Sequence, residues 1–280
     1  MQPIASMKEE VKDPENFAYL KRKVAQTIDF DSSKYSDSFL ARRFFVRLRK
    51  HNINTYAQYI QILNNKPEEW ENLKTELTIH VTHLFRDKEF WEALQKDVIP
   101  ALTKYKDEKK QKNIEIWSAG CSSGEEPTSI AISFLETLGA KISRYNVSIL
   151  GTDYDHEIVA KAMAAVYEEP QFRETDEKIR DKYFVKNANG TYTPIPQVRS
   201  MIRYRQEDMF ASTPKNVDMI FCRNVVIYFE RDAKKQLYEN FYESLNPGGF
   251  FILGKTEYLD GEAREKFKIS NMRERVYRKE

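Results

Sequence analysis

The stretch that decides the fold is Trp117-Ser118-Ala119-Gly120-Cys121-Ser122-Ser123-Gly124-Glu125-Glu126-Pro127. The apolar run at residues 114–117 predicts a buried strand before it, and the pattern of residues 127–138 predicts a helix after it. Pro127 suits the first turn of that helix, where its missing N–H leaves no hydrogen bond unmade. Open α/β sheets bind nucleotides at such strand-to-helix turns. A plain structural turn is equally compatible with this segment alone.

The composition of this turn indicates what kind of ligand would suit it. It lacks the three glycines of the dinucleotide fingerprint, and no Lys-Ser or Lys-Thr pair follows Gly124, so it is not a phosphate-binding loop. Glu125 and Glu126 would repel a phosphate group. A nucleoside that lacks phosphates and carries a cationic group fits better, and S-adenosylmethionine has both an ammonium and a sulfonium group.

A further acidic residue strengthens the prediction of a nucleoside site. The next strand, predicted at residues 147–151, leads into Asp153, which stands 29 residues after Gly124. An acid at the carboxyl end of the second strand commonly binds ribose hydroxyls. The alternative is that Asp153 caps the helix predicted at residues 158–165, but Asp155 could cap that helix and leave Asp153 for the ribose.

The rest of the C-terminal part continues the alternation of strands and helices. Strands are predicted at residues 217–222 and 250–253, and a helix at residues 231–245 separates them. Such alternation predicts βαβ units and a mostly parallel sheet.

Residues 182–206 break this alternation. Two β-like runs, residues 183–185 and 200–204, flank a loop that contains Asn189-Gly190. We therefore expect a small antiparallel insertion at this place.

The N-terminal part reads differently, because residues 17–79 show helical periodicity without alternating β-branched runs. This pattern predicts a small all-α domain. In the helix predicted at residues 38–50, Leu40, Phe44 and Leu48 recur at every fourth position and form the expected buried side.

The same predicted helix is strongly basic. Residues 38–67 hold six Lys or Arg and no Asp or Glu. Exposed helices usually mix charges, because opposite charges attract and like charges repel one another one turn apart. The five basic residues within the helix therefore form either an ordinary solvated face or a docking surface for an acidic partner. They are Arg42, Arg43, Arg47, Arg49 and Lys50.

Composition limits the class of protein. The 280 residues carry 45 Lys and Arg against 43 Asp and Glu, which argues against a general nucleic-acid coat protein. The sequence contains no run of about 18 apolar residues, so no membrane span is predicted. The N-terminus also lacks the apolar core of a signal peptide. With Cys121 and Cys222 as the only cysteines a disulfide scaffold is excluded, so we expect a cytoplasmic protein in which both are small buried residues. His80 and His83 lack a third ligand cluster, so no metal site is predicted.

Four further segments, taken with the glycine turn, resemble a known family. They are Leu77-Thr78-Ile79-His80-Val81-Thr82-His83-Leu84-Phe85-Arg86, Gly151-Thr152-Asp153-Tyr154-Asp155, Phe221-Cys222-Arg223-Asn224-Val225-Val226-Ile227-Tyr228-Phe229 and Leu245-Asn246-Pro247-Gly248-Gly249. In order and spacing they resemble the CheR family of S-adenosylmethionine-dependent enzymes, which methylate glutamyl side chains of chemotaxis receptors. The resemblance spans residues 17–277, and its third segment is highly specific.

The resemblance implies the three parts that the periodicity also predicts. They are a Rossmann-like α/β S-adenosylmethionine-dependent methyltransferase domain, a small antiparallel β-insertion in it, and a small all-α domain before it. We place the helical domain at residues 1–83, a linker at residues 84–95 and the methyltransferase domain at residues 96–280, with the insertion at residues 182–206.

The resemblance also implies which residues surround the cofactor. Glu126 would contact its methionine ammonium group, and Asp153 its ribose, beside the turn at Gly120. Asp208 and Met209 stand where the family usually has Asn-Leu, near the adenine. Asp208 loses the amide donor of that asparagine, which puts direct reading of the adenine by this side chain in doubt.

A second group of residues would lie around the methionine end of the cofactor. Arg223 and Asn224 would line its methionine and sulfonium groups, and Tyr228 would lie close to the transferring methyl. Thr82 and Arg86 would close the pocket, with Arg86 placed to hold a carboxylate of substrate or cofactor. We expect Arg86 and Tyr228 to act in catalysis as positioning groups.

His80 is the second departure from the family, which commonly has asparagine at this position. A ring nitrogen of His80 could replace the amide as a hydrogen-bonding group, so we keep His80 among the expected cofactor contacts.

The implied reaction is methyl transfer to glutamate carboxylates on the cytoplasmic methylation helices of chemoreceptors, with S-adenosylhomocysteine as the second product. A glutamate has an ordinary pKa of about 4.3, so it is ionised at neutral pH and needs no general base. The basic helix would face the acidic receptor helices, and we expect a monomer that binds no nucleic acid and does not insert into the membrane. The loop at residues 186–193 is short, so we expect action that does not depend on a receptor tether.

Two other functions stay open at this stage. One is a methyltransferase that acts on a small molecule or an RNA, and the other is an inactive module that senses S-adenosylmethionine. Retention of Arg223, Asn224 and Tyr228 argues against the sensor, because binding alone would not require a complete lining on the methyl side.

Overall fold

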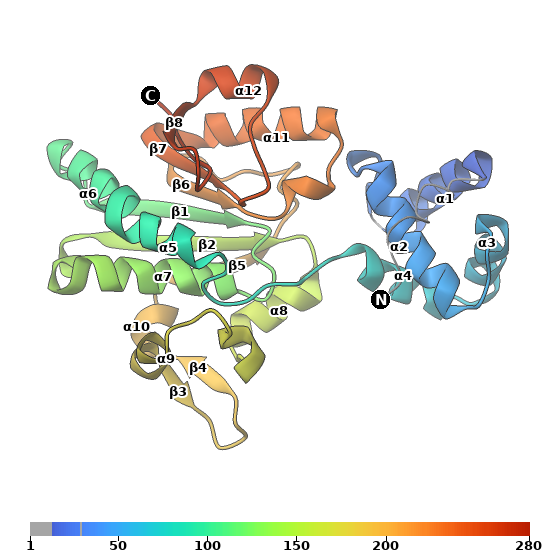
Figure 1. The fold of residues 1–280 in the computed structure, drawn as a ribbon, viewed down its shortest axis with the longest axis horizontal. Coiled ribbons are helices and arrows are strands. Elements are labelled where there is room, and N and C mark those ends of the chain that lie inside the picture. The colour runs from blue at the N-terminus through green and yellow to red at the C-terminus, as the bar shows by residue number, and fades with distance from the viewer. Residues whose placement is uncertain (1–12, 29) are drawn as a thin grey trace. The chain divides into compact units, whose positions relative to one another are not determined.

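The computed structural model describes residues 13–28 and 30–280, which form two compact units. The helical unit contains the described residues up to Ile79 together with Tyr228–Lys234. The sheet unit contains His80–Ile227 and Lys235–Glu280 (Figure 1). Among the helices of the described residues, none is long and apolar enough to cross a membrane.

The helical unit is all α, as the periodicity predicted. The hydroxyl of Ser36 accepts the N–H of Phe39 and so caps the first turn of the basic helix. Leu40, Phe44 and Leu48, the predicted buried side of this helix, are at most 4% exposed and belong to the core of the unit. In chain order the elements are α1 (Pro14–Thr27), η2 (Ser32–Lys34), α2 (Asp37–Lys50), α3 (Tyr56–Asn65) and α4 (Glu68–Leu77).

A seven-stranded sheet with the order β5-β2-β1-β6-β7-β9-β8 forms the centre of the sheet unit (Figure 1). The strands from β5 to β7 are parallel to their neighbours, and β9 is antiparallel to both β7 and β8. Strand β1 lies between β2 and β6, so the direction of strand order reverses there, and ligands of such sheets bind at the carboxyl ends of the strands around this point. The strands are β1 (Asn113–Ala119), β2 (Asn146–Asp153), β5 (Ile202–Gln206), β6 (Val217–Cys222), β7 (Leu245–Leu253), β8 (Lys268–Asn271) and β9 (Val276–Arg278).

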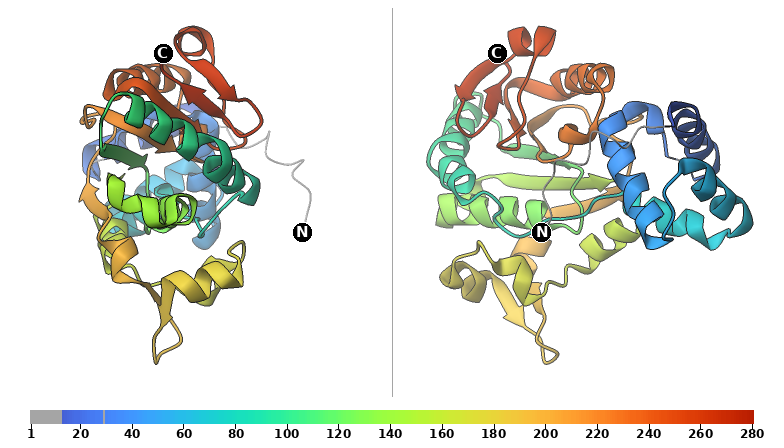
Figure 2. Two further views of the ribbon diagram at one scale, coloured as in Figure 1. Left: turned by 90° about the vertical axis from the view of Figure 1, so that its left-hand side faces the viewer. Right: turned by 45° about the vertical axis from the view of Figure 1, so that its right-hand side comes forward.

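Helices pack on both faces of this sheet, which Figure 2 shows from two further directions. Ile116 and Phe221 belong to a core shared with α5, η3, α6 and α7. Trp117 points to the other face, because successive strand residues alternate, and its ring lies 5.2 Å from that of Phe241 in α11. The helices are α5 (Lys88–Ala93), η3 (Leu94–Val98), α6 (Ile99–Glu108), α7 (Glu125–Leu138), η4 (Gly139–Arg144), α8 (His156–Ala164), η6 (Val226–Tyr228), α11 (Arg231–Ser244) and α12 (Gly261–Lys266).

A small antiparallel sheet exists where the insertion was predicted, but one of its predicted strands is wrong. Strand β3 pairs with β4, whereas the run at residues 200–204 contributes to β5, which is parallel to β2. Ile202 and Tyr204 alternate with arginines, a pattern that fits any half-exposed edge strand and does not reveal its partner. The elements of this region are η5 (Glu169–Phe172), α9 (Glu177–Tyr183), β3 (Phe184–Lys186), β4 (Tyr192–Pro194) and α10 (Pro196–Arg199).

Residues 84–95, the predicted linker, contribute to the core of the sheet unit. Leu84, Phe90, Trp91 and Leu94 are at most 3% exposed and belong to the same core as α7. This segment includes α5 and positions Arg86, so it is part of the framework of the site.

Candidate active site

The turn after β1 is shaped by Gly120 and bonded to β2. The N–H groups of Gly120 and Cys121 donate to the carbonyl of Thr152, at 2.8 and 2.9 Å. Gly120 has a φ of 79°, in the left-handed region that favours glycine. A Cβ at this position would lie 2.7 Å from Val225 and 3.5 Å from Met209. The turn thus brings together the segments that follow β1, β5 and β6.

Asp153 ends β2 and faces this turn. Its Oδ2 accepts the N–H of Ser122 at 2.9 Å, and its Oδ1 accepts the N–H of Asp155 at 3.2 Å. Burial raises the pKa of Asp153. The helix-capping role belongs to Asp155, whose Oδ1 accepts the N–H of Glu157 at 2.8 Å. The alternative considered for Asp153 is therefore excluded, and its carboxylate lies beside the glycine turn.

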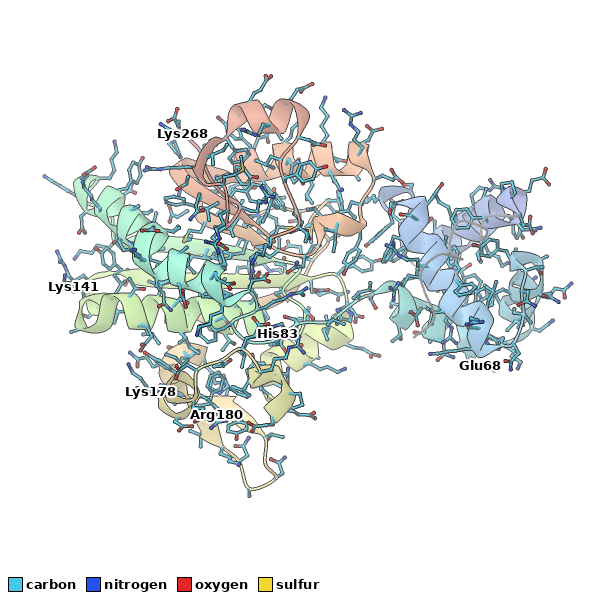
Figure 3. All side chains as sticks on the ribbon, in the orientation of Figure 1. Glu68, His83, Lys141, Lys178, Arg180 and Lys268 are labelled. Carbon is cyan, nitrogen blue, oxygen red and sulfur yellow. The ribbon has the colours of Figure 1, made fainter. Side chains whose placement is uncertain are left out.

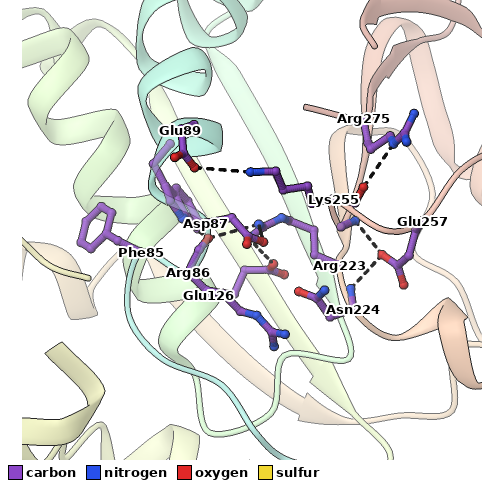
Figure 4. Close-up of polar contacts among 12 residues, drawn as sticks. Phe85, Arg86, Asp87, Glu89, Glu126, Arg223, Asn224, Lys255, Glu257 and Arg275 are labelled. Atoms are coloured by element: carbon purple, nitrogen blue, oxygen red, sulfur yellow. Dashed lines mark hydrogen bonds and ion pairs between the residues drawn. The ribbon is translucent and has the colours of Figure 1, made fainter. Parts of the chain in front are cut away.

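Glu126 lies in the first turn of α7, next to Arg223 from the end of β6 (Figure 4). The Ser118 hydroxyl donates to its Oε1 at 2.7 Å, and Nη1 of Arg223 lies 3.6 Å from its Oε2. Burial raises the pKa of Glu126, although the charge of Arg223 acts in the opposite direction. The nearby cation therefore does not fully compensate the buried carboxylate, and a positively charged ligand would stabilise it.

Arg223 is fixed from its other side by the segment that leads into α5. Its Nη2 donates to Oδ2 of Asp87 at 2.8 Å and to the carbonyl of Arg86 at 3.1 Å. Its guanidinium lies 4.3 Å from the centre of the Phe90 ring. Its Nε is buried and has no hydrogen-bond partner among the described residues, so an acceptor on a ligand would satisfy it.

Arg86 lies between two residues with left-handed backbone, Phe85 at φ 55° and Asp87 at φ 64°. Its Nη1 donates to the carbonyl of Val81 at 3.0 Å. Figure 4 shows its side chain beside Glu126. Thr82, in the same segment, is half-buried and makes no side-chain hydrogen bond with any described residue. Thr82 and Arg86 thus lie in the same segment as Asp87, whose carboxylate pairs with Arg223.

His80 and His83 have separate partners. Nε2 of His80 lies 3.1 Å from Oδ2 of Asp155, and the His80 carbonyl accepts the Ser122 hydroxyl at 3.4 Å. Nε2 of His83, which is labelled in Figure 3, lies 2.8 Å from a carboxylate oxygen of Glu174. His80 is thereby held at the glycine turn, whereas His83 is bonded to the segment before α9. Within the described ranges no three His, Cys, Asp or Glu side chains gather as metal ligands would.

Asp208 and Met209 follow β5 and differ in their surroundings. Oδ1 of Asp208 accepts the N–H of Phe210 at 2.9 Å, and the backbone carbonyl of Asp208 accepts the N–H of Ala211 at 3.0 Å. Asp208 therefore organises the turn that follows β5. Met209 reaches the vicinity of Gly120. The apolar side chain of Met209 thus borders the glycine turn.

Asn224 has a φ of 61° and is held by Glu257, a residue that the sequence analysis did not identify. Oε2 of Glu257 accepts the N–H of Asn224 at 2.8 Å. Asp153 ends β2 and Glu257 lies four residues beyond β7, so an acid near the carboxyl end of a core strand is the signal that could have found it.

Tyr228 differs from the other predicted cofactor-site residues in the compact unit to which it is assigned. It belongs to the helical unit, where its ring lies 5.0 Å from that of Phe39. Its closeness to the transferring methyl stays a prediction.

Two of the five members of the predicted docking surface are paired with acids of the helical unit. Arg47 is 5% exposed and forms two hydrogen bonds with Glu69, at 2.8 and 2.7 Å. Arg43 is half-buried and pairs with Glu76 at 3.1 Å. Both acids lie on α4, beyond the acid-free stretch, so a local search along the sequence could not find them. Within α2 the exposed members are Arg42, Arg49 and Lys50.

Both cysteines are buried free thiols, as expected, and burial raises the pKa of each. A thiol with a raised pKa is a poor nucleophile at neutral pH. Cys121 and Cys222 therefore act as packing residues at the ends of β1 and β6.

Comparison with known proteins assigns this arrangement to a family. Residues 80–276 match the CheR methyltransferase SAM-binding domain, and residues 15–78 match the CheR methyltransferase all-alpha domain. The chain belongs to the CheR methyltransferase family. A chemotaxis protein methyltransferase of Listeria monocytogenes serovar 1/2a is 32% identical over 245 residues, which cover 87% of this chain and 90% of that protein. Chemotaxis protein methyltransferase 2 of Vibrio cholerae is 31% identical over 238 residues, which cover 83% and 81%.

Membership in the CheR family confirms the predicted fold and cofactor: the protein is an S-adenosylmethionine-dependent methyltransferase of chemotaxis. The residues of the site fit this cofactor. Asp153 and Glu126 are carboxylates with raised pKa values, suited to a ribose and an ammonium group, and the Nε of Arg223 still has an unmade hydrogen bond among the described residues.

Proposed function

We propose that this CheR-family enzyme methylates glutamate side chains on the cytoplasmic helices of chemoreceptors. The observation that supports the cofactor side is the pair of desolvated carboxylates, Asp153 and Glu126, at the carboxyl edge of the sheet. The acceptor side is supported by two relatives that are both named chemotaxis protein methyltransferases. We further propose that the enzyme acts in the cytoplasm as a monomer and binds no nucleic acid.

Each residue of the site has a proposed task toward the cofactor. When bound, S-adenosylmethionine supplies an electrophilic methyl group on a sulfonium. Glu126 would bind its ammonium group and Asp153 its ribose, while Met209 would pack against the adenine beside Gly120. Arg223 would donate from its Nε to the carboxylate of the cofactor.

The other predicted site residues would line the edges of the cofactor pocket. Asn224 would line the methionine end from the turn after β6. His80 and Thr82 would close the pocket from the segment that precedes α5, and the hydrogen bond of His80 to Asp155 fixes its ring for that role. The turn of Asp208 would hold Met209 in place.

The reaction needs positioning rather than proton transfer. An acceptor glutamate with a pKa of about 4.3 is already ionised at neutral pH. Arg86 would hold its carboxylate in line with the methyl group, and such positioning can supply about 7–11 kcal/mol of the barrier. Opposite charges on donor and acceptor cancel in the transition state, so a water-excluding pocket favours the reaction. Tyr228 would complete the lining on the methyl side.

The docking surface of α2 would consist of Arg42, Arg49 and Lys50, its exposed members. Receptor methylation helices are rich in glutamate, so such a surface would attract them at long range. Rim charges of this kind mostly set association rate and orientation.

A label-transfer assay tests the proposal. Purified enzyme, methyl-tritiated S-adenosylmethionine and membranes that contain a chemoreceptor should yield label on the receptor that is released as methanol by mild base. Base-stable label, or label on no receptor although the enzyme binds the cofactor, would contradict glutamyl ester formation.

A further inference from the structure

Glu257 is a buried carboxylate that lies between two strand ends. It is 3% exposed and follows β7. Its Oε2 accepts the N–H of Gly254 at 2.6 Å and that of Asn224 at 2.8 Å, and its Oε1 accepts the N–H of Ile227 at 3.3 Å. The carboxylate thus ties the turn after β6 to the turn after β7, as Figure 4 shows for Asn224 and Glu257.

These contacts offset part of the cost of burying the Glu257 carboxylate. Burial raises the pKa of Glu257, while the three backbone N–H groups act in the opposite direction. No cation pairs directly with this carboxylate among the described residues, so backbone dipoles are its main partners. Because hydrogen bonds to an ionised acceptor are stronger than neutral ones, the turn is held more tightly than by a neutral side chain.

The turn that Glu257 holds needs such support. Asn224 has a φ of 61°, a left-handed conformation that is less favourable for a residue with a Cβ than for glycine. Its side-chain amide makes no hydrogen bond with any described residue, so its position depends on the backbone that Glu257 holds. A Cβ on Gly254 would lie 2.7 Å from Oε2 of Glu257 and 2.9 Å from the side-chain amide nitrogen of Asn224. The close approach of these two residues therefore requires glycine at position 254.

We propose that Glu257 is a positioning residue, which fixes the turn that carries Asn224 so that its free amide meets the methionine end of the cofactor. The inference rests on the proposed cofactor contact of Asn224. It assigns Glu257 no contact with the cofactor and no proton transfer.

The experiment measures binding of S-adenosylhomocysteine by calorimetry, together with melting temperature, and needs no receptor. Glu257→Gln keeps the shape but replaces one acceptor oxygen by an NH₂ group that faces backbone donors. We expect the dissociation constant to rise by about fivefold or more. Asp218 provides a control for the loss of a buried carboxylate at the opposite end of β6, because it is 2% exposed, accepts the N–H of Glu115 at 2.9 Å and pairs with Lys106 at 2.7 Å. Asp218→Asn should lower the melting temperature and leave the dissociation constant unchanged.

Two outcomes would overturn the inference. The first is wild-type affinity in Glu257→Gln, and the second is an equal loss of affinity in Asp218→Asn, which would indicate general loosening. If Glu257→Gln does not fold, Glu257→Asp decides, because its shorter side chain draws the carboxylate away from the same N–H groups without a new contact to Asn224.

Asn224→Ala separates this inference from the assignment on which it rests. Weaker binding in Asn224→Ala with normal binding in Glu257→Gln contradicts the positioning role alone. Normal binding in Asn224→Ala removes the cofactor contact, and the inference with it, whereas receptor methylation stays measurable by label transfer.

Discussion

In the helical unit the guanidinium of Arg47 and the carboxylate of Glu69 meet through two parallel hydrogen bonds, with both side chains at most 5% exposed. The Tyr59 hydroxyl donates to the same carboxylate at 2.8 Å, and Nε2 of His51 lies 3.1 Å from it. The most basic helix of the chain is thus joined to α4 through one of its arginines. This pair stabilises the fold and is not available for a partner.

Glu69→Ala should destabilise the protein strongly. It leaves the Arg47 guanidinium buried without its counter-charge, and removal of one partner of a buried pair costs about 3–5 kcal/mol. Urea unfolding would measure the loss. The double variant Arg47→Met, Glu69→Leu should recover a large part of it, because two apolar side chains replace both charges. A single variant as stable as the wild type would contradict the structural role.

The same pair predicts a pH dependence of stability. Burial alone would raise the pKa of Glu69, but hydrogen bonds from Arg47, Tyr59 and His51 outweigh it and lower the pKa from 4.5 to about 2. A lowered pKa in the folded state stabilises the protein above pH 4.5, and this stabilisation is lost as pH falls from 4.5 toward 2. Urea unfolding at a series of acidic pH values should show a shallower loss in Glu69→Gln than in the wild type. Identical slopes would exclude Glu69 as the group that titrates.

Asp153→Asn should weaken binding of S-adenosylmethionine by about tenfold or more, because an amide is a poorer acceptor for the ribose hydroxyls than a carboxylate. Calorimetry measures the affinity. The control Asp176→Asn removes a charge at another helix cap, where the side chain accepts the N–H of Lys178 at 2.8 Å, and it should change melting temperature more than affinity. If the two variants lose affinity equally, Asp153 has no special place in the site.

Cofactor binding should weaken as the medium becomes acidic. Because burial raises the pKa of Glu126, its carboxylate takes up a proton at a higher pH than an ordinary glutamate does and then no longer attracts the ammonium group. The amino group of the ligand, with an ordinary pKa of about 7.7–8, stays protonated over this range. Dissociation constants measured at falling pH should rise less steeply in Glu126→Gln, with a remaining slope from Asp153. A steeper or unchanged slope would exclude Glu126 as the ammonium ligand.

The exposed basic residues of α2 predict that binding of the receptor depends on salt concentration. The double variant Arg42→Glu, Arg49→Glu should raise the KM for receptor and weaken its dependence on ionic strength, with cofactor affinity unchanged. Arg22 on α1 and Lys66 after α3 are also exposed, so the double variant Arg22→Glu, Lys66→Glu gives a charge-matched control. Initial rates at several salt concentrations measure the effect. An equal change in this control would show that net charge, and not this surface, matters.

Local patterns were enough to predict the framework of the site. The strand, glycine turn and helix around Gly120 are adjacent in sequence, so their periodicity and turn chemistry are visible together. That Asp155 rather than Asp153 caps α8 could also be predicted, because a cap residue stands at a fixed distance in sequence from the helix that it precedes.

Contacts between distant segments could not be predicted in this way. Arg47 lies 22 residues from Glu69, on another helix, so the acid-free stretch around Arg47 looked unpaired. Strand β5 has the alternation of an edge strand, and only tertiary packing selects β2 as its neighbour. Glu257 lies 33 residues from Asn224, and a single acid after a strand carries no mark of the turn that it holds.

Tyr228→Phe should lower turnover and leave cofactor affinity unchanged. The hydroxyl is proposed to line the methyl side only when donor and acceptor are aligned, so its loss should reduce kcat and kcat/KM together. The substitution keeps the ring, which packs 5.0 Å from Phe39, so folding should be preserved. Label transfer under saturating cofactor measures kcat, and calorimetry measures affinity. Phe39→Leu is the control for packing, because it loosens the same contact and leaves the hydroxyl in place. Normal turnover in Tyr228→Phe would remove this residue from the methyl side, and equal losses in both variants would assign it a packing role.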